Sequence, residues 1–137
     1  TILNAMEGVT TEGTGTRVFA GAPYRSGGKT GTAQAVTIGQ KDKYNAAKLA
    51  ERQRDHALYS AFAPADKPQV ALAVIVENAG FGAASAAPIA RRVFDYLLLG
   101  RYPSEENIRL TRLGQTSAPI GPSRQASELD WPPAAQR

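Results

Sequence analysis

The spacing of apolar residues predicts two helices. Four apolar residues recur at helical intervals over 1–9, and the pattern stops in the Thr- and Gly-rich stretch 10–16. A second pattern predicts a helix over 86–99, with Pro88 in its first turn and Gly100 as its stop. Its expected buried face carries Ile89, Val93, Tyr96 and Leu97, and Arg91 and Arg92 lie off that face.

Runs rich in β-branched and apolar residues predict the strands. The run at 30–38 is rich in β-branched residues, mostly threonine, and a short strand is expected at 17–20. Two further runs, 57–63 and 69–78, are joined by a linker that is shorter than the dozen or so residues of a parallel crossover. They therefore predict an antiparallel hairpin. Because residues 70–76 are almost wholly apolar, we expect that strand to be covered on both faces and central in its sheet.

Two segments have a different character. Residues 45–54 combine good helix formers with an asparagine cap, which predicts a short surface helix. Residues 114–137 carry prolines among Ser, Gln and Ala without an apolar period, which is typical of disorder. The length of 137 residues predicts one domain at most. We expect a compact part over 1–100 and a mostly disordered tail rich in Pro, Ser and Ala over 101–137.

Composition narrows the possible chemistry. The chain has no cysteine and one histidine, which excludes thiolate zinc sites and cysteine nucleophiles, so we expect no metal and no cofactor. The net charge of +4 permits anionic partners without requiring them. No zinc pattern or interleaved aromatic stripe points to nucleic acid, and we expect no such partner. The longest apolar run, 70–76, is far short of the ~20 residues that cross a bilayer.

Two glycine motifs have ordinary interpretations. A phosphate-binding loop ending in Gly28-Lys29-Thr30 needs a glycine where Pro23 stands, and a helix where strand formers follow. The segment 80–85 follows a strand and precedes a helix like a dinucleotide-binding turn, but Ser85 replaces its last glycine. We interpret that segment as a strand-to-helix turn.

The third motif is Lys-Thr-Gly on a strand, a signature of the penicillin-recognising serine acyl-transfer enzymes. The match extends over Gly-Lys-Thr-Gly-Thr-Ala-Gln at 28–34, Tyr-Asn-Ala at 44–46, Ala-Glu-Arg at 50–52, Arg-Asp-His at 54–56, Ala-Phe-Ala-Pro at 61–64, Pro-Gln-Val-Ala at 68–71 and Val-Glu-Asn at 76–78. Over residues 1–100 the chain thereby resembles the C-terminal part of the transpeptidase domain in the penicillin-binding protein 2 family. These are class B, elongation-specific peptidoglycan D,D-transpeptidases of rod-shaped Gram-negative bacteria.

The resemblance implies an α+β fold, with an antiparallel sheet flanked by helices, as in penicillin-binding proteins and serine β-lactamases. It implies that a serine attacks the D-Ala-D-Ala bond of a stem peptide and that the acyl group passes to a neighbouring amine. β-Lactams acylate the same serine. Lys29 and Thr32 are then the expected catalytic residues, through positive potential and the oxyanion-hole amide. The expected substrate-binding residues are Thr30, Gly31, Thr32 and Gln34.

The chain departs from the family pattern in its nucleophile. It has no Ser-x-Asn element, and its one Ser-x-x-Lys is Ser26 to Lys29, where two glycines disfavour the helix that the family uses. We therefore expect a C-terminal fragment that supplies the Lys-Thr-Gly strand and lacks the nucleophile. The alternative is a non-catalytic module that binds envelope partners. His56 is expected to be a hydrogen-bonded structural residue.

Partners and location follow from the resemblance alone. The expected partners are stem peptides, β-lactams, and the glycosyltransferase and scaffold proteins of the elongation machinery. The expected place is the periplasmic face of the bacterial inner membrane, with a membrane anchor only upstream of this chain. A basic cluster is either a solvated face or a contact with anionic envelope polymer or a partner subunit: Lys41, Lys43, Lys48, Arg52 and Arg54.

Overall fold

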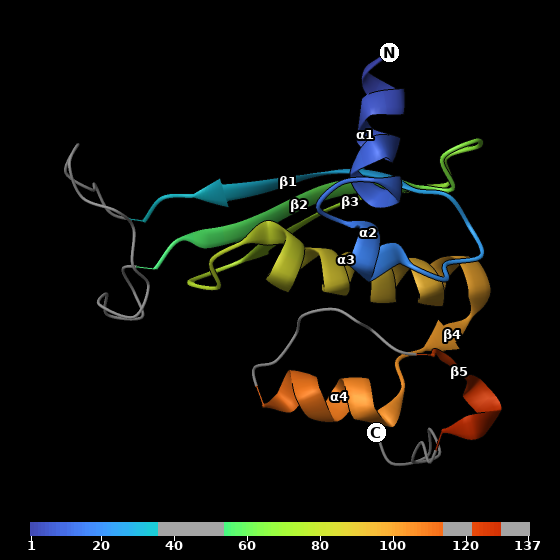
Figure 1. Cartoon of the computed structure of the whole chain (residues 1–137). Coiled ribbons are helices and arrows are strands. Elements are labelled where there is room, and N and C mark those ends of the chain that lie inside the picture. The colour runs from blue at the N-terminus through green and yellow to red at the C-terminus, as the bar shows by residue number, and fades with distance from the viewer. Residues whose placement is uncertain (36–53, 114–121, 130–137) are drawn as a thin grey trace.

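A three-stranded antiparallel sheet forms the centre of the molecule (Figure 1). The computed structural model describes residues 1–35, 54–113 and 122–129. Strands β1 (Gly27–Ala33), β2 (His56–Ala63) and β3 (Val70–Val76) pair in the order β1-β2-β3. The predicted hairpin is confirmed as β2 and β3. Strand β1 begins before the predicted 30–38 and ends at Ala33.

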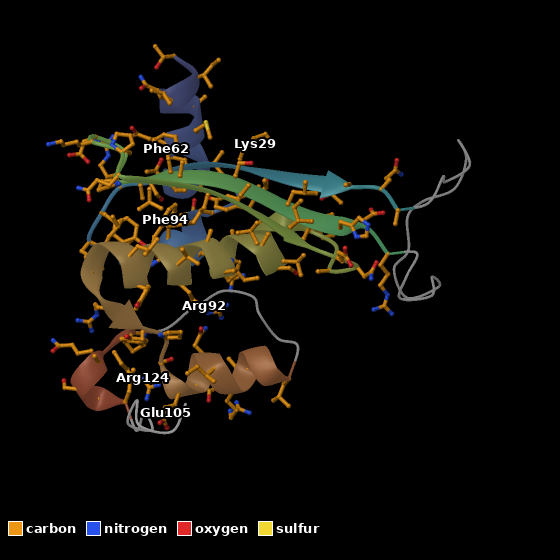
Figure 2. All side chains as sticks on the ribbon, turned by 180° about the vertical axis from the view of Figure 1, so that it is seen from behind. Lys29, Phe62, Arg92, Phe94, Glu105 and Arg124 are labelled. Atoms are coloured by element: carbon orange, nitrogen blue, oxygen red, sulfur yellow. The ribbon has the colours of Figure 1, made fainter. Side chains whose placement is uncertain are left out.

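Helices cover both faces of the sheet. Helix α1 (Ile2–Thr11) packs on β1, while α3 (Gly82–Leu99) packs on β2 and β3, and α2 (Thr16–Phe19) contacts α1 and α3. Figure 2 shows Phe94 of α3 and Phe62 of β2 on opposite faces of the sheet. The family fold class predicted above, an antiparallel sheet flanked by helices, is present.

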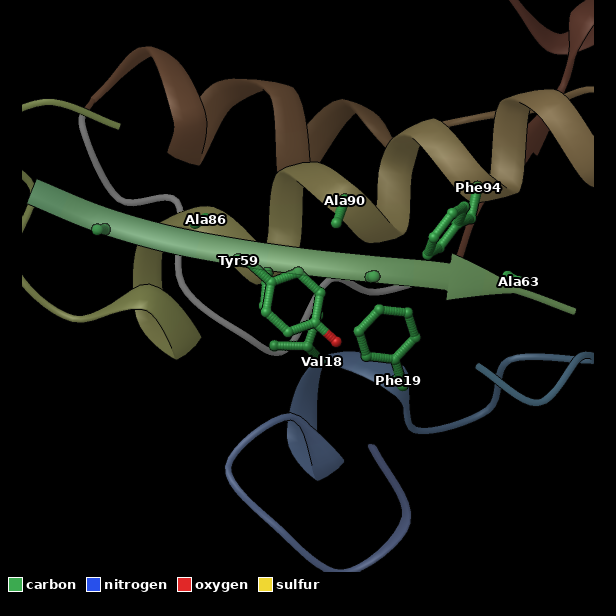
Figure 3. Close-up of a cluster of buried hydrophobic side chains, with 10 residues drawn as sticks. Val18, Phe19, Tyr59, Ala63, Ala86, Ala90 and Phe94 are labelled. Atoms are coloured by element: carbon green, nitrogen blue, oxygen red, sulfur yellow. The ribbon is translucent and has the colours of Figure 1, made fainter. Parts of the chain in front are cut away.

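The core lies between the sheet and α3, and most of its members are alanine (Figure 3). The small side chains let helix and sheet approach closely, and Tyr59 and Phe94 fill the remaining space, both fully buried. The ring of Phe19 lies 6.2 Å from that of Tyr59 and 6.4 Å from that of Phe94. The core members are Val18, Phe19, Ala57, Tyr59, Ala61, Ala63, Ala86, Ala87, Ala90 and Phe94.

The buried face of α3 differs from the predicted one. Val93, Tyr96 and Leu97 are exposed and Ile89 is half-buried, whereas Ala86, Ala87, Ala90, Arg91 and Phe94 are buried. Two neighbouring stripes of this helix carry apolar residues, so periodicity alone does not select between them. Arg91 is buried because Asp95, one turn later, neutralises its charge. The helix begins at Gly82, which places Pro88 inside it, and the predicted stop at Gly100 is confirmed by its left-handed backbone (φ 63°).

The strand predicted at 17–20 was wrong, and the central position predicted for 70–76 is not seen within the described strands. Residues 17–20 belong mostly to α2, because Val18 and Phe19 enter the core on a single helical turn. Strand β3 is at one end of the sheet within the described residues, and it alternates between half-buried and exposed positions, with Ile75 66% exposed. Strand order is set by which segments pair, and a continuous apolar run does not determine it.

The segment after residue 100 carries regular structure where we expected a mostly disordered tail. It contains β4 (Arg101–Tyr102), α4 (Glu105–Arg112), β5 (Arg124–Gln125) and the 3-10 turn η3 (Ala126–Glu128). Figure 1 shows β4 turning back under the C-terminal end of α3. Strands β4 and β5 pair antiparallel, and Tyr102 packs edge-on against Tyr96. The proline-rich composition did not predict these elements, because side-chain contacts to α3 stabilise them.

Several predictions lie outside the described residues, including the helix over 45–54 and most of the basic cluster. The division of the chain at residue 100 stays a prediction. Within the described residues, no helix is both long and apolar enough to cross a bilayer. The same residues contain no cluster of three or more His, Asp or Glu side chains that could hold a metal ion.

Candidate functional site

The predicted site residues lie on or directly after β1, at one end of the described sheet. Glycines at the start of the strand allow it to lie close to β2. A Cβ atom on Gly27 would lie 2.5 Å from the Phe62 ring, and one on Gly28 would lie 2.2 Å from the Tyr59 hydroxyl. Burial raises the pKa of that Tyr59 phenol above its ordinary value. These contacts fix the position of β1 against β2.

The two threonines share one face of β1. The strand register opposes Thr30 to Tyr59 and Thr32 to Ala57, and both partners point to the α3 face of the sheet. Thr30 is half-buried and Thr32 is exposed. Two neighbouring hydroxyls on this face are thus available to an incoming carboxylate.

The turn between α1 and α2 adds a third hydroxyl. The Oγ1 atom of Thr14 lies 3.4 Å from the Oγ1 atom of Thr30. Sequence reasoning missed Thr14, because a threonine in a Gly-rich turn carries no signal that it will meet a strand residue distant in the sequence.

Lys29 lies on the other face of the strand and is exposed. Figure 2 shows it on the side of the sheet that carries α1. Its Nζ atom nevertheless reaches around the strand and donates a hydrogen bond to the Thr30 carbonyl at 2.6 Å. The cation is therefore held at the outer edge of β1, next to the threonines.

The backbone of β1 also presents polar groups at that edge. A Cβ atom on Gly82 would lie 2.2 Å from Leu58 O, 2.8 Å from Gly31 O and 3.2 Å from Gly31 N. Gly31 and Leu58 are register partners, and the closeness of Leu58 O and Gly31 N to the same point is typical of a pair whose backbone groups face each other. Because an antiparallel ladder alternates, the N–H and C=O groups of Thr30 and Thr32 point away from β2.

We expect Gly82→Ala to destabilise the chain by about 1–3 kcal/mol. The new methyl group would lie against backbone atoms of both β1 and β2, which cannot move aside as a flexible side chain can. Gly8→Ala is the matched control, because no atom lies within 4 Å of its added Cβ and it sits in α1. Urea denaturation measures the free energy of unfolding of both variants. Equal free energies of unfolding would contradict this close packing.

The remaining sequence candidates are placed as follows. Gln34 comes directly after β1 and is exposed. Ser26 is only 3% exposed, its carbonyl accepts a hydrogen bond from Thr10 Oγ1 at 2.6 Å, and it precedes a strand rather than opening a helix. His56 begins β2, and its Nδ1 accepts a hydrogen bond from the Asn78 backbone at 3.0 Å. His56 is thus hydrogen-bonded, as expected, and its structural role stays a prediction.

Comparison with known proteins identifies the family. Residues 1–95 match the penicillin binding protein transpeptidase domain, and the chain belongs to that family. The peptidoglycan D,D-transpeptidase MrdA of Haemophilus influenzae is 49% identical over 94 residues, covering 69% of this chain and 14% of the relative. The MrdA of Acinetobacter baumannii is 54% identical over 97 residues, covering 71% of this chain and 14% of the relative. This chain therefore spans a small part of the relatives' length.

A solved structure agrees with this assignment. The crystal structure of Pseudomonas aeruginosa PBP2 in complex with WCK 5153 is 37% identical, with a TM-score of 0.57. The match covers 77% of this chain and 19% of that chain. The predicted family and fold class are both confirmed.

Proposed function

We propose that this chain forms one wall of the active site of a peptidoglycan D,D-transpeptidase, which cross-links stem peptides by serine acyl transfer. The observation that carries the proposal is the outer edge of β1. There the Lys29 ammonium, the Thr30 and Thr32 hydroxyls and two outward-facing backbone amides lie together. Membership of the transpeptidase domain family supports the same chemistry.

Each group has a role in acyl transfer. The serine oxygen attacks the carbonyl between the two D-alanines, and charge develops on the carbonyl oxygen. The Thr32 amide donates a hydrogen bond to that oxygen, an interaction worth about 3–4 kcal/mol of barrier in other acyl-transfer enzymes. The C–N bond then breaks, and D-alanine leaves with a proton on its amine. Finally, the amine of a neighbouring peptide attacks the acyl-enzyme and regenerates the serine.

The substrate carboxylate is held by the other groups. Thr30 and Thr32 donate hydroxyl hydrogen bonds to it, and Lys29 supplies positive potential. Gly31 has no side chain, which lets the peptide lie against the strand, and Gln34 extends this edge. A β-lactam, whose carboxylate and amide mimic the dipeptide, would bind the same groups. The nucleophile comes from residues outside this chain.

The cellular setting belongs to the same proposal. A transpeptidase that acts on stem peptides works on the periplasmic face of the inner membrane. Its partners would be a glycosyltransferase that polymerises the glycan and scaffold proteins of the elongation machinery.

Intact-mass analysis with a penicillin tests the proposal. The proteins are this chain alone and the Haemophilus influenzae relative carrying this chain in place of its matching segment. We expect a covalent adduct on the chimera and none on the isolated chain. An adduct on the isolated chain would show that Ser26 or another of its own residues is the nucleophile. No adduct on the chimera would favour the non-catalytic envelope module.

Lys29→Ala in the chimera isolates the contribution of β1. We expect it to slow acylation at least about tenfold, because a charge-assisted interaction of about 1.5–3 kcal/mol is lost. Lys67→Ala is the matched control, since Lys67 is equally exposed but lies in the turn between β2 and β3. Equal acylation rates for the two variants would exclude a role for Lys29.

A further inference from the structure

A cavity lies between α2, the C-terminal end of α3, and the β4–β5 pair. Its volume is about 530 Å³, within the range of small-molecule sites. Three arginines from three different elements line it: Arg17 of α2, Arg91 of α3 and Arg101 of β4. None of the described residues that line it is acidic.

The charges of these arginines are not equally compensated. Arg91 is paired with Asp95, and its Nη1 atom also donates to the carbonyls of Val18 at 3.0 Å and Ala20 at 3.3 Å. Among the described residues, Arg101 donates to neutral oxygens of Ser123, including Oγ at 2.8 Å, and to no carboxylate. Arg17 is exposed and has no side-chain partner among the described residues. Within the described part of the chain, the cavity therefore carries two positive charges that no carboxylate compensates.

Two of the three guanidinium groups are held in place before any ligand arrives. Arg91 is 7% exposed and is fixed by its bonds to Asp95 and the α2 backbone. Arg101 is fixed by Ser123, which itself lines the cavity. Of the two uncompensated arginines, Arg101 is thus already fixed and loses little side-chain entropy when it binds a tetrahedral oxyanion.

The charge and shape of the cavity favour a phosphate ester. Two uncompensated guanidinium groups match the charge of about −1.5 to −2 that a phosphate monoester carries near pH 7, whereas a carboxylate carries one charge. Apart from the three arginines and Ser123, the described lining residues carry no polar side chain, with Val18, Pro23 and Leu99 among them, so the wall suits a neutral or apolar substituent on the phosphate.

We propose that this cavity binds a phosphate monoester, either a free small molecule or a lipid headgroup, with Arg17 and Arg101 as the charged contacts. The site uses none of the β1 residues, so it extends beyond the proposed acyl transfer and can fail independently of it.

The first test is a phosphate titration of the 137-residue chain followed by NMR of arginine Nε–Hε groups, with chloride at equal ionic strength as the blank. We expect saturable shifts at Arg17 and Arg101. Arg17→Gln should weaken binding about tenfold, because one charge-assisted contact is lost. Arg17 is exposed, so this variant should keep the fold. Arg109→Gln is the matched control, since Arg109 pairs with Glu106 on α4 and does not line the cavity.

Vesicles distinguish the two sources of the phosphate. Sedimentation with phosphatidic acid vesicles, compared with phosphatidylcholine vesicles, identifies a headgroup site if Arg17→Gln weakens binding and inorganic phosphate competes. Binding of inorganic phosphate without vesicle binding identifies a soluble ligand. The proposal is overturned if phosphate gives no saturable shifts, or if Arg17→Gln and Arg109→Gln weaken binding equally.

Discussion

Asp95→Ala is expected to destabilise the chain by about 3–5 kcal/mol, because it leaves the Arg91 guanidinium buried without its counter-charge. Arg91 Nε donates to both carboxylate oxygens of Asp95, at 2.9 and 3.0 Å, and both side chains are nearly fully buried. The Tyr24 hydroxyl donates to the same carboxylate at 2.7 Å. Burial, reinforced by this hydrogen bond to Asp95, raises the pKa of the Tyr24 phenol.

This ion pair attaches α2 and the chain that follows it to α3. Arg91 binds the α2 backbone at Val18 and Ala20, and its guanidinium carbon lies 6.0 Å from the centre of the Phe19 ring. The loss of Asp95 therefore affects two elements rather than one. Asp95→Asn keeps one acceptor oxygen and should cost less than Asp95→Ala.

Urea denaturation followed by circular dichroism measures these free energies of unfolding. Glu106→Ala is the control, because Glu106 is an exposed helical acid that also pairs with an arginine, Arg109. The hydrogen bond from Arg109 lowers the pKa of Glu106, yet the pair is exposed, and exposed pairs contribute little to stability. A cost for Asp95→Ala as small as that of the control would show that Arg91 reaches solvent when released.

Phe94→Ala should cost a similar amount, about 3–5 kcal/mol. The Phe94 ring is fully buried and meets the rings of Phe19 and Tyr24 at 6.4 and 6.2 Å between centres. Much of the surrounding core is alanine, whose short side chains cannot move to fill the space. The cavity left behind therefore stays open, which favours the upper part of the range.

Phe81→Ala separates this cavity effect from the loss of an aromatic ring as such. Phe81 precedes the first turn of α3 and is 69% exposed, so we expect a change within about 0.5 kcal/mol. Phe94→Leu should recover most of the loss, because leucine refills much of the volume. If Phe81→Ala and Phe94→Ala had equal free energies of unfolding, the assignment of the core would be wrong.

The sequence was informative wherever local geometry decides the outcome. The short linker between 57–63 and 69–78 forced an antiparallel hairpin, and Gly100 ended α3 through its left-handed backbone. The orientation of α3 was not predictable. Arginine is normally expected at the surface, and the burial of Arg91 depends on its contact with Asp95, which is also buried. The order of the described strands, with β3 at one end, was not predictable either, because it depends on which strands pair.

In the candidate site, too, local features were predictable from the sequence and long-range contacts were not. The Lys-Thr-Gly motif located the strand, and strand alternation placed Thr30 and Thr32 together. The approach of Gly82 to Gly31 and of Thr14 to Thr30 depends on packing between distant segments, and the sequence carried no local sign of it. The roles of Lys29, Thr30, Gly31, Thr32 and Gln34 stay predictions until acylation is measured.

Several arginines that donate to uncharged oxygens hold the segment after Gly100 together, and one of them, Arg92, joins it to α3. Arg92 donates to the amide of Asn107 at 2.5 Å, Arg101 to the Ser123 hydroxyl at 2.8 Å, and Arg124 to the Pro103 carbonyl at 3.0 Å. None of these acceptors is protonated when the pH falls to the range in which carboxylates lose their charge. These three hydrogen bonds should therefore persist under acidic conditions that disrupt ordinary salt bridges, such as the one between Arg124 and Glu105.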